Sequence, residues 1–214
     1  MGAIGLIDYG NLLNIDREWA KDVMAYIEKK ADRKTNWWWS EMLLCLMKVA
    51  ADPRPINSMI KMLEGARRKS MPVLVFGNGG SAATASHFVC DLNKTAQRAG
   101  ANPFHASCLS DNTSLITAWA NDFDYASVFT RQLPNHGLVR GVVVGISCSG
   151  NSRNVLDAIQ HAKVLGAITI GLTGGGGKLG DVVDISIKVP SEDALMIEGI
   201  HSVILHYVTQ RLRE

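Results

Sequence analysis

From Met71 onward, five short apolar runs alternate with longer segments that have a helical pattern of apolar residues. Nearly continuous apolar runs are typical of strands that helices cover on both faces, and therefore of a mostly parallel sheet. Between them we expect helices over 81–98, 112–133, 152–165 and 192–213. The runs expected to form the strands are VLVF (73–76), FHASCL (104–109), VVVGIS (142–147), AITIGL (167–172) and DISIKV (184–189).

This alternation predicts an α/β fold, a three-layer α-β-α sandwich around a five-stranded, mostly parallel sheet. In such folds ligands bind at the carboxyl ends of the strands. The N-terminal part is poor in glycine and helical in pattern, so we expect a helical extension over residues 1–54 and one α/β domain over residues 55–214. Three successive tryptophans at 37–39 point about 100° apart on a helix. We interpret them as core packing plus a subunit contact rather than as a ligand platform.

Composition excludes several classes of protein. The formal net charge of the 214-residue chain is +2, which gives no reason to expect a nucleic-acid partner. No apolar stretch reaches the length of a membrane span, and the first ten residues lack the pattern of a signal peptide. The four cysteines have no paired spacing, so we interpret them as reduced thiols of a cytoplasmic protein.

A glycine-rich loop, Gly77-Asn78-Gly79-Gly80-Ser81, separates the first expected strand from the helix that follows. Glycines permit positive φ and a close approach of the backbone, and the N-terminus of a helix offers free N–H groups to an anion. Ser81 fits a helix cap as well as a ligand contact. The loop lacks the lysine of a Walker motif and the G-x-G-x-x-G spacing, so alone it is a weak signal for phosphate.

A second polar loop, ISCSGNSRNV (146–155), also lies between a strand and a helix. Ser147, Ser149 and Ser152 supply hydroxyls, Cys148 supplies a thiol, and the backbone around Gly150 supplies N–H donors. An ordinary capped turn needs one hydroxyl, whereas three in six residues exceed what capping requires. A neutral cradle at a helix N-terminus suits the phosphate of a sugar phosphate better than a nucleotide with magnesium.

Two expected helices carry histidines with carboxylates nearby. His87 and Asp91 lie four residues apart and therefore share a helix face, a spacing that serves a metal, a base with its orienting carboxylate, or simple surface chemistry. On the last helix, Glu198 and His206 are eight residues apart, a rise of about 12 Å that is too long for one ion. If both serve one site, they come from two subunits or Glu198 precedes the regular helix. His201 fits a hydrogen-bonded core residue.

Four segments together resemble the sugar isomerase (SIS) domain of bacterial phosphoheptose isomerases, over about residues 55 to 212. They are VFGNGGSAATASHFVCDL, LSDNTSLITAWANDFDYASVFTRQL, GVVVGISCSGNSRNVLDAIQHAKVLGAITIGLTG, and GGKLGDVVDISIKVP followed by IEGIHSVILHYV. The resemblance implies a cytoplasmic homotetramer, with sites at subunit interfaces, that converts sedoheptulose 7-phosphate into a heptose 7-phosphate.

The same resemblance implies roles for individual residues. Zinc and catalytic positions fall on His87, Asp91, Glu198 and His206, with His206 matching the catalytic histidine of the family. Substrate and phosphate contacts fall on Asn78, Gly79, Ser81, Asp111, Ser147, Cys148, Ser149 and Ser152.

Three positions depart from the family pattern. Cys148 replaces a usual threonine, which weakens one hydrogen bond and leaves the loop intact. Asp91 replaces a glutamate and is one methylene shorter, and an error of about 1 Å in position can cost on the order of a hundredfold in rate. Glu198 replaces a glutamine, so it adds a negative charge that strengthens a site for a divalent ion or supplies a base in place of Asp91.

The expected mechanism is proton transfer between adjacent carbons through a cis-enediol. A carboxylate, Asp91 or Glu198, removes the proton, His206 is the partner acid, and zinc polarises the oxygens. Two alternatives stay open. One is a non-catalytic SIS protein that binds a sugar phosphate or a protein partner, as replication-initiator-associating relatives do. The other is an isomerase of a different phosphosugar that uses the same pocket.

Overall fold

The computed structural model describes residues 22, 25, 37–137 and 140–214. The chain divides into two compact units, Met1–Ala51 and Asp52–Glu214, which are described separately. In the first unit the described helix is α2 (Trp37–Ala51), where the rings of Trp38 and Trp39 meet edge to face with centroids 5.1 Å apart. Most of the predicted extension before Trp37 lies outside the described residues, and the subunit contact of the tryptophans stays a prediction.

The second unit is built on a five-stranded sheet in the order β2-β1-β3-β4-β5, in which every pair of neighbours is parallel. The expected strands are confirmed, and the sheet is parallel throughout. The central strand β3 is buried at all six positions, which explains why the sequence of this strand is continuously apolar. The strand bounds are β1 (Pro72–Gly77), β2 (His105–Cys108), β3 (Val142–Ser147), β4 (Ile168–Thr173) and β5 (Ile185–Lys188).

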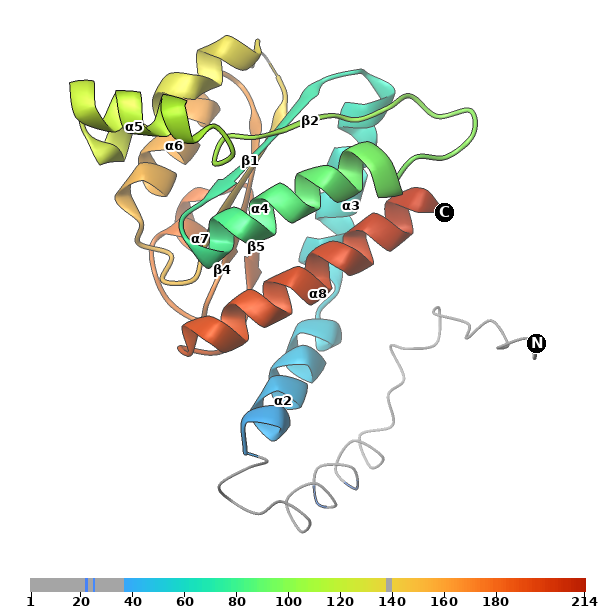
Figure 1. Cartoon of the computed structure of the whole chain (residues 1–214). Coiled ribbons are helices and arrows are strands. Elements are labelled where there is room, and N and C mark those ends of the chain that lie inside the picture. The colour runs from blue at the N-terminus through green and yellow to red at the C-terminus, as the bar shows by residue number, and fades with distance from the viewer. Residues whose placement is uncertain (1–21, 23–24, 26–36, 138–139) are drawn as a thin grey trace. The chain divides into compact units, whose positions relative to one another are not determined.

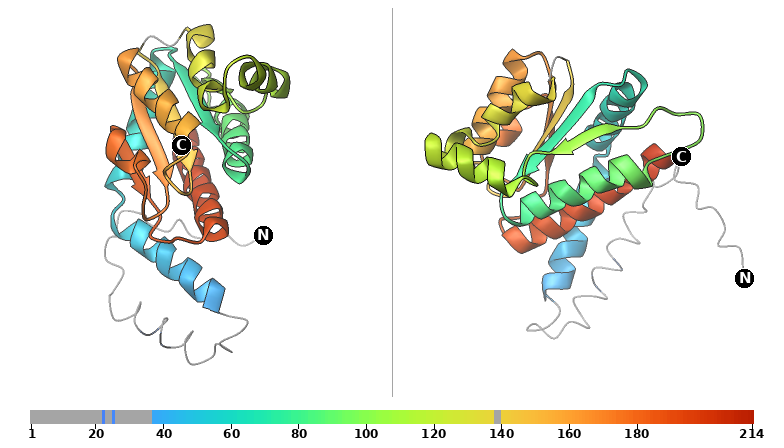
Figure 2. Two further views of the ribbon diagram at one scale, coloured as in Figure 1. Left: turned by 90° about the vertical axis from the view of Figure 1, so that its left-hand side faces the viewer. Right: turned by 45° about the horizontal axis from the view of Figure 1, so that its top comes forward.

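Helices cover both faces of the sheet and make the three layers that the sequence predicts (Figures 1 and 2). Helices α3 (Arg54–Arg68), α4 (Gly80–Cys90) and α8 (Ala194–Arg213) form one layer, where α8 packs against both α3 and α4. Helices α5 (Thr113–Asp122), α6 (Arg153–Val164) and α7 (Leu179–Val182) lie on the other side. Side chains of β1, β3 and α6 form a buried apolar cluster between sheet and helices, in which Phe76 stacks on Phe129. Among the described residues, no helix is long and apolar enough to cross a membrane.

Two expected helices differ from the prediction. The segment 112–133 is not one helix: α5 ends at Asp122, and two 3-10 segments follow, Tyr125–Ser127 and Thr130–His136. The break comes at Asp124, which has extended backbone angles and whose carboxylate accepts the Ser127 N–H at 2.7 Å. The segment 81–98 is helical to Thr95, but it widens into a π-helical turn over Asp91–Thr95.

Candidate active site

The two polar loops meet at the point where the strand order reverses. Strand β1 has β2 on one side and β3 on the other, so the connections that leave β1 and β3 diverge and open a crevice at their carboxyl ends. Gly77 of β1 is in register with Ile146 of β3. The loops that follow these strands therefore lie next to each other, at the N-termini of α4 and α6.

The first loop brings a buried hydroxyl to the crevice. Gly79 has φ +55°, a conformation that favours glycine, and it places the first turn of α4 directly after the loop. Ser81 is 4% exposed, and its Oγ lies 3.7 Å from the Sγ of Cys148 in the second loop. An added Cβ on Gly80 would overlap the Glu198 carboxylate, so that carboxylate lies directly against the start of α4.

The second loop is held in shape by hydroxyls and by neighbouring backbone. The Oγ atoms of Ser147 and Ser152 lie 3.0 Å apart, and the Ser149 Oγ accepts the Asn151 N–H at 3.2 Å. Its Cys148 and Gly150 carbonyls accept N–H groups from Gly174 and Leu179 at 3.0 and 2.9 Å. The glycine-rich segment 174–177, which the sequence analysis did not assign to the site, therefore supports the loop.

The Cys148 thiol faces Ser81 and the Glu198 carboxylate, whose Oε1 lies 3.8 Å from the sulfur. Burial is the main cause that raises the pKa of this thiol, and the negative charge of Glu198 adds to the effect. Cys148 therefore stays a neutral thiol, which can donate a weak hydrogen bond but is a poor nucleophile.

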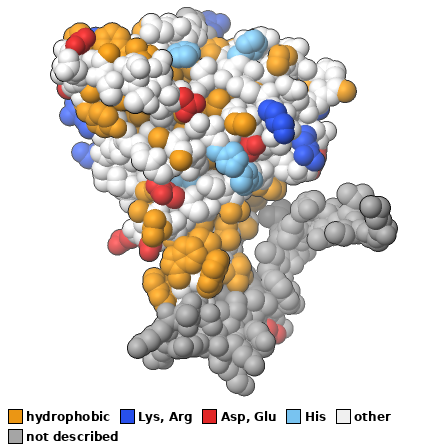
Figure 3. All heavy atoms as spheres, viewed as in Figure 1, with side chains coloured by type: hydrophobic (Ala, Val, Ile, Leu, Met, Phe, Trp, Pro, Cys, Tyr) orange, Lys and Arg blue, Asp and Glu red, His pale blue; other side chains and the backbone are white. Residues whose placement is uncertain are grey.

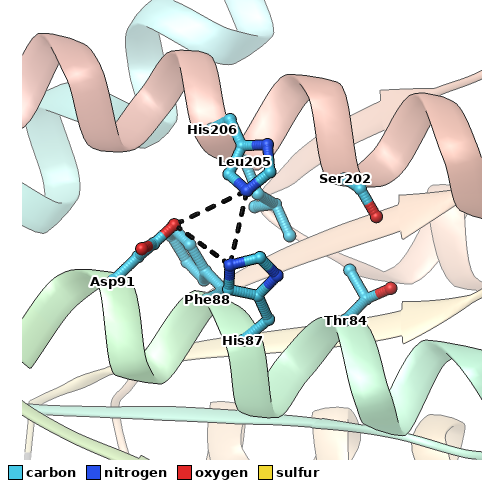
Figure 4. A pocket seen from close by; sticks show the side chains of 7 residues that line it. All are labelled: Thr84, His87, Phe88, Asp91, Ser202, Leu205 and His206. Carbon is cyan, nitrogen blue, oxygen red and sulfur yellow. Dashed lines mark hydrogen bonds and ion pairs between the residues drawn. The ribbon is translucent and has the colours of Figure 1, made fainter. Parts of the chain in front are cut away.

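Helices α4 and α8 bring together two imidazoles and a carboxylate (Figure 4). The Nε2 of His87 and the Nε2 of His206 are 3.5 Å apart, and the Asp91 Oδ2 lies 3.9 and 3.8 Å from them. Thr84, Phe88, Ser202 and Leu205 complete a notch of about 10 Å³, which has room for one small ion. Both imidazoles reach the surface over these helices, where Figure 3 shows histidine side chains side by side.

The donor set of this cluster fits a divalent metal ion. One ligand atom from each of His87, Asp91 and His206 lies within 4.8 Å of the other two, and two imidazoles with one carboxylate are donors that zinc accepts. Asp91 is the first residue of the π-helical turn, and such widened turns in helices often coincide with functional sites.

Glu198 lies apart from this cluster within the chain. Because α8 is regular from Ala194, Glu198 is inside the helix, and its carboxylate lies beside Gly80 and Cys148 at the two polar loops. One of the two ways in which Glu198 and His206 could share an ion is therefore excluded, and the other requires a second subunit. His201, on the same helix, is fully buried, with its Nε2 3.3 Å from the Thr173 carbonyl oxygen.

Asp111 lies in the turn after β2, exposed at the same edge of the sheet as the two loops. Two residues that the sequence analysis did not assign also reach this edge. Asn154, in the first turn of α6, exchanges hydrogen bonds with Asn78, and Tyr125 contacts the same Asn78. The sequence offered only a weak signal for Asn154: asparagines occur in the segments that follow β1 and β3, the two strands at the point where the strand order reverses.

Comparisons with known proteins agree with this arrangement. A sequence profile of the SIS domain matches residues 38–174. A probable phosphoheptose isomerase of Thermoplasma acidophilum is 43% identical over 143 residues, which are 66% of this chain and 78% of that protein. The phosphoheptose isomerase of Geobacter metallireducens is 43% identical over 156 residues, 72% of this chain and 81% of that protein.

A solved structure gives the same result for the fold. The structure of a phosphoheptose isomerase from Francisella tularensis superposes with a TM-score of 0.77 at 28% identity, and the match covers 85% of this chain and 97% of that one.

Proposed function

The chain belongs to the phosphoheptose isomerase family of SIS-domain proteins, and from this premise we propose that it interconverts sedoheptulose 7-phosphate and D-glycero-D-manno-heptose 7-phosphate. The observation that carries the proposal is the position of the metal-ligand cluster relative to the phosphate loops. Ser81 and His87 lie on one helix, six residues and a rise of about 9 Å apart. The extended carbon chain of a heptulose phosphate can bridge that distance.

The phosphate would bind between the two loops. Hydroxyls of Ser81, Ser147, Ser149 and Ser152 and the N-termini of α4 and α6 offer donors without a fixed positive charge. The neutral Cys148 thiol can add a weak donor. Asp111 would accept a hydrogen bond from a sugar hydroxyl. Holding the phosphate in this way presents the carbonyl end of the sugar to the carboxylates and His206, and this fixed placement lowers the entropic part of the barrier.

Proton transfer needs one carboxylate and one acid. The Asp91 carboxylate is shared with two imidazoles, which favours its use as a metal ligand and leaves Glu198 as the base that takes the proton next to the carbonyl. His206 would donate a proton to the carbonyl oxygen as the cis-enediol forms and would take a proton from the hydroxyl on the adjacent carbon as it collapses, while Glu198 returns its proton to that adjacent carbon. A bound zinc ion, held by His87, Asp91 and His206, would supply a Lewis acid that polarises the substrate oxygens.

For Glu198 to serve the same site as His206, the site must include a second subunit. We therefore propose a homotetramer in the cytoplasm with sites between subunits, in which a neighbouring chain supplies Glu198. A monomeric protein with full activity would contradict this part of the proposal.

The test is exchange of the carbon-bound proton of the substrate with deuterated solvent, measured over phosphosugars of five to seven carbons together with the zinc content. Exchange and isomerisation of the seven-carbon ketose support the proposal. Activity on a shorter sugar alone assigns a different phosphosugar. Absence of zinc and of exchange with every sugar identifies a binding protein rather than an enzyme.

A further inference from the structure

The side-chain amides of Asn78 and Asn154 hydrogen-bond to each other in both directions and so connect the two polar loops. Asn78 follows β1, and Asn154 lies in the first turn of α6 and is 3% exposed. The Nδ2 of each residue donates to the Oδ1 of the other, and both distances are 2.9 Å. Tyr125, from the 3-10 turn after α5, places its hydroxyl 2.9 Å from the Asn78 Oδ1. Three segments that are distant in the sequence therefore meet at one amide.

A backbone group fixes which way the amides point. The Val155 N–H lies 3.0 Å from the side chain of Asn154, and because an N–H only donates, the atom that it faces must be Oδ1. The Asn78 atom opposite that oxygen must then be Nδ2. The other Asn78 atom, which faces the Asn154 Nδ2 and the Tyr125 hydroxyl, is therefore Oδ1, and the tyrosine must donate.

Among the hydrogen bonds between described residues, this orientation leaves one polar group of the Asn78 side chain free. Its Oδ1 accepts two hydrogen bonds, from Asn154 and Tyr125, which use both lone pairs. Its Nδ2 has two hydrogens, and one is engaged by the Asn154 Oδ1. One N–H remains, at the edge of the sheet where the phosphate loops lie. Asn78 can therefore donate one hydrogen bond to a ligand and cannot accept one.

We propose that Tyr125 and Asn154 are positioning residues. They hold the side-chain amide of Asn78 in one orientation, in which it donates a hydrogen bond to an oxygen of the bound phosphosugar and accepts none. The proposal rests on the proposed function, since it needs a phosphosugar in the crevice. An acceptor oxygen occurs in the phosphate and in the sugar, and both suit a lone N–H. These two contacts keep the amide from turning its oxygen toward an anionic ligand, and such a ligand would be repelled by that oxygen.

A double-mutant cycle tests whether Tyr125 acts through Asn78. Tyr125→Phe removes the hydroxyl alone. In the otherwise unchanged protein it should weaken binding of sedoheptulose 7-phosphate about three- to tenfold, seen as a higher KM with kcat nearly unchanged. In the Asn78→Ala background the same change should have no effect. An equal effect in both backgrounds, or none in either, overturns the proposal.

Replacements that keep the shape of the side chain separate positioning from packing. Asn78→Asp is nearly isosteric but has no N–H, so it should bind the sugar phosphate more weakly than Asn78→Ala; binding as tight as that of the unchanged protein contradicts the donor role. Asn154→Asp keeps the acceptor for Val155 and for the Asn78 Nδ2 but cannot donate to the Asn78 Oδ1, so it should also raise KM. Thr117→Val, which removes an exposed hydroxyl of α5, is the matched control and should leave KM and the melting temperature unchanged.

The dissociation constant of inorganic phosphate, measured by calorimetry, locates the acceptor. An effect of Tyr125→Phe on this constant places the acceptor on the phosphate, and an effect confined to the sugar phosphate places it on the sugar. Unchanged protein that neither binds nor isomerises the heptulose phosphate overturns the proposed function. Additive effects of Tyr125→Phe and Asn78→Ala in an active protein overturn only the locking of Asn78.

Discussion

The Nε2 atoms of His87 and His206 lie 3.5 Å apart although 119 positions separate the two residues in the sequence. Packing of α4 against α8 makes this contact, and the Asp91 Oδ2 lies 3.9 and 3.8 Å from the two Nε2 atoms. Three atoms that could hold a metal ion are thus assembled within one chain.

Removal of one imidazole should abolish metal binding with little effect on the fold, because both rings are more than half exposed. Loss of an outer-shell partner alone costs about 10–100-fold in metal affinity, so His206→Ala, which removes a ligand, should lower zinc affinity by at least about a hundredfold. Competition against a zinc-buffering chelator measures the affinity. His161→Ala, on α6 in the other layer, is the control and should bind zinc normally. Full zinc occupancy of His206→Ala would show that the cluster is not the metal site.

Two adjacent glycines, Gly176 and Gly177, of the segment that supports the second polar loop should respond differently to alanine. Gly177 has φ +85°, and an added Cβ would overlap the Ser149 carbonyl oxygen, whereas no atom lies within 4 Å of a Cβ on Gly176. We expect Gly177→Ala to lower the free energy of unfolding by about 2–4 kcal/mol and to weaken binding of inorganic phosphate. Gly176→Ala should stay within about 0.5 kcal/mol of the unchanged protein. Urea unfolding and phosphate titration measure both effects, and equal behaviour of the two variants would contradict the prediction.

Buried His201 should make the stability of the protein depend on pH. Burial lowers the pKa of His201 from 6.5 to about 4, and the hydrogen bond to Thr173 opposes this shift only in part. The unfolded chain therefore binds the extra proton between these two values, so the free energy of unfolding is highest above pH 6.5 and falls as the pH is lowered toward 4. The difference amounts to about 2–3 kcal/mol between about pH 7.5 and about pH 4.5.

His201→Leu removes the titrating group and should show a smaller loss of stability between the same two pH values, whatever its stability at neutral pH. Urea unfolding at each pH gives the two differences. An identical pH dependence of the variant and the unchanged protein would mean that another group dominates in this range.

The three central strands were predictable because helices bury them on both faces, and β3 shows this directly, with an apolar sequence and no exposed position. The break after α5 was not predictable from periodicity, because it depends on the Asp124 carboxylate capping Ser127 in a sequence that otherwise continues a helical pattern. The π-helical turn at Asp91 interrupts no apolar periodicity in the sequence, so the helical pattern alone did not predict it.

The site was predictable in parts. The helical spacing of His87 and Asp91 placed these two side chains on one face, but the pairing with His206 depends on how α8 packs on α4, and only the family resemblance indicated it. The helical rise between Glu198 and His206 predicted that the two residues cannot bind one ion from a single helix, and the structure places both in the continuous helix α8. The contact of Tyr125 with Asn78 joins segments 47 residues apart, and no local pattern encodes it.

Asp91 and Glu198 should have different roles that two isosteric changes can separate. Asp91 lies between two imidazoles, so Asp91→Asn should lose zinc affinity and proton exchange together. Glu198 lies beside Cys148 and Gly80 and outside the cluster of its own chain, so Glu198→Gln should keep the zinc bound by the other three ligands. If Glu198 is the base, the Glu198→Gln variant should exchange the substrate proton with solvent about 10²–10⁴-fold more slowly than the unchanged protein. Zinc content and the exchange rate, measured on the same samples, give both readouts. Exchange at the unchanged rate in Glu198→Gln would exclude Glu198 as the base and favour Asp91, the other carboxylate proposed for proton transfer.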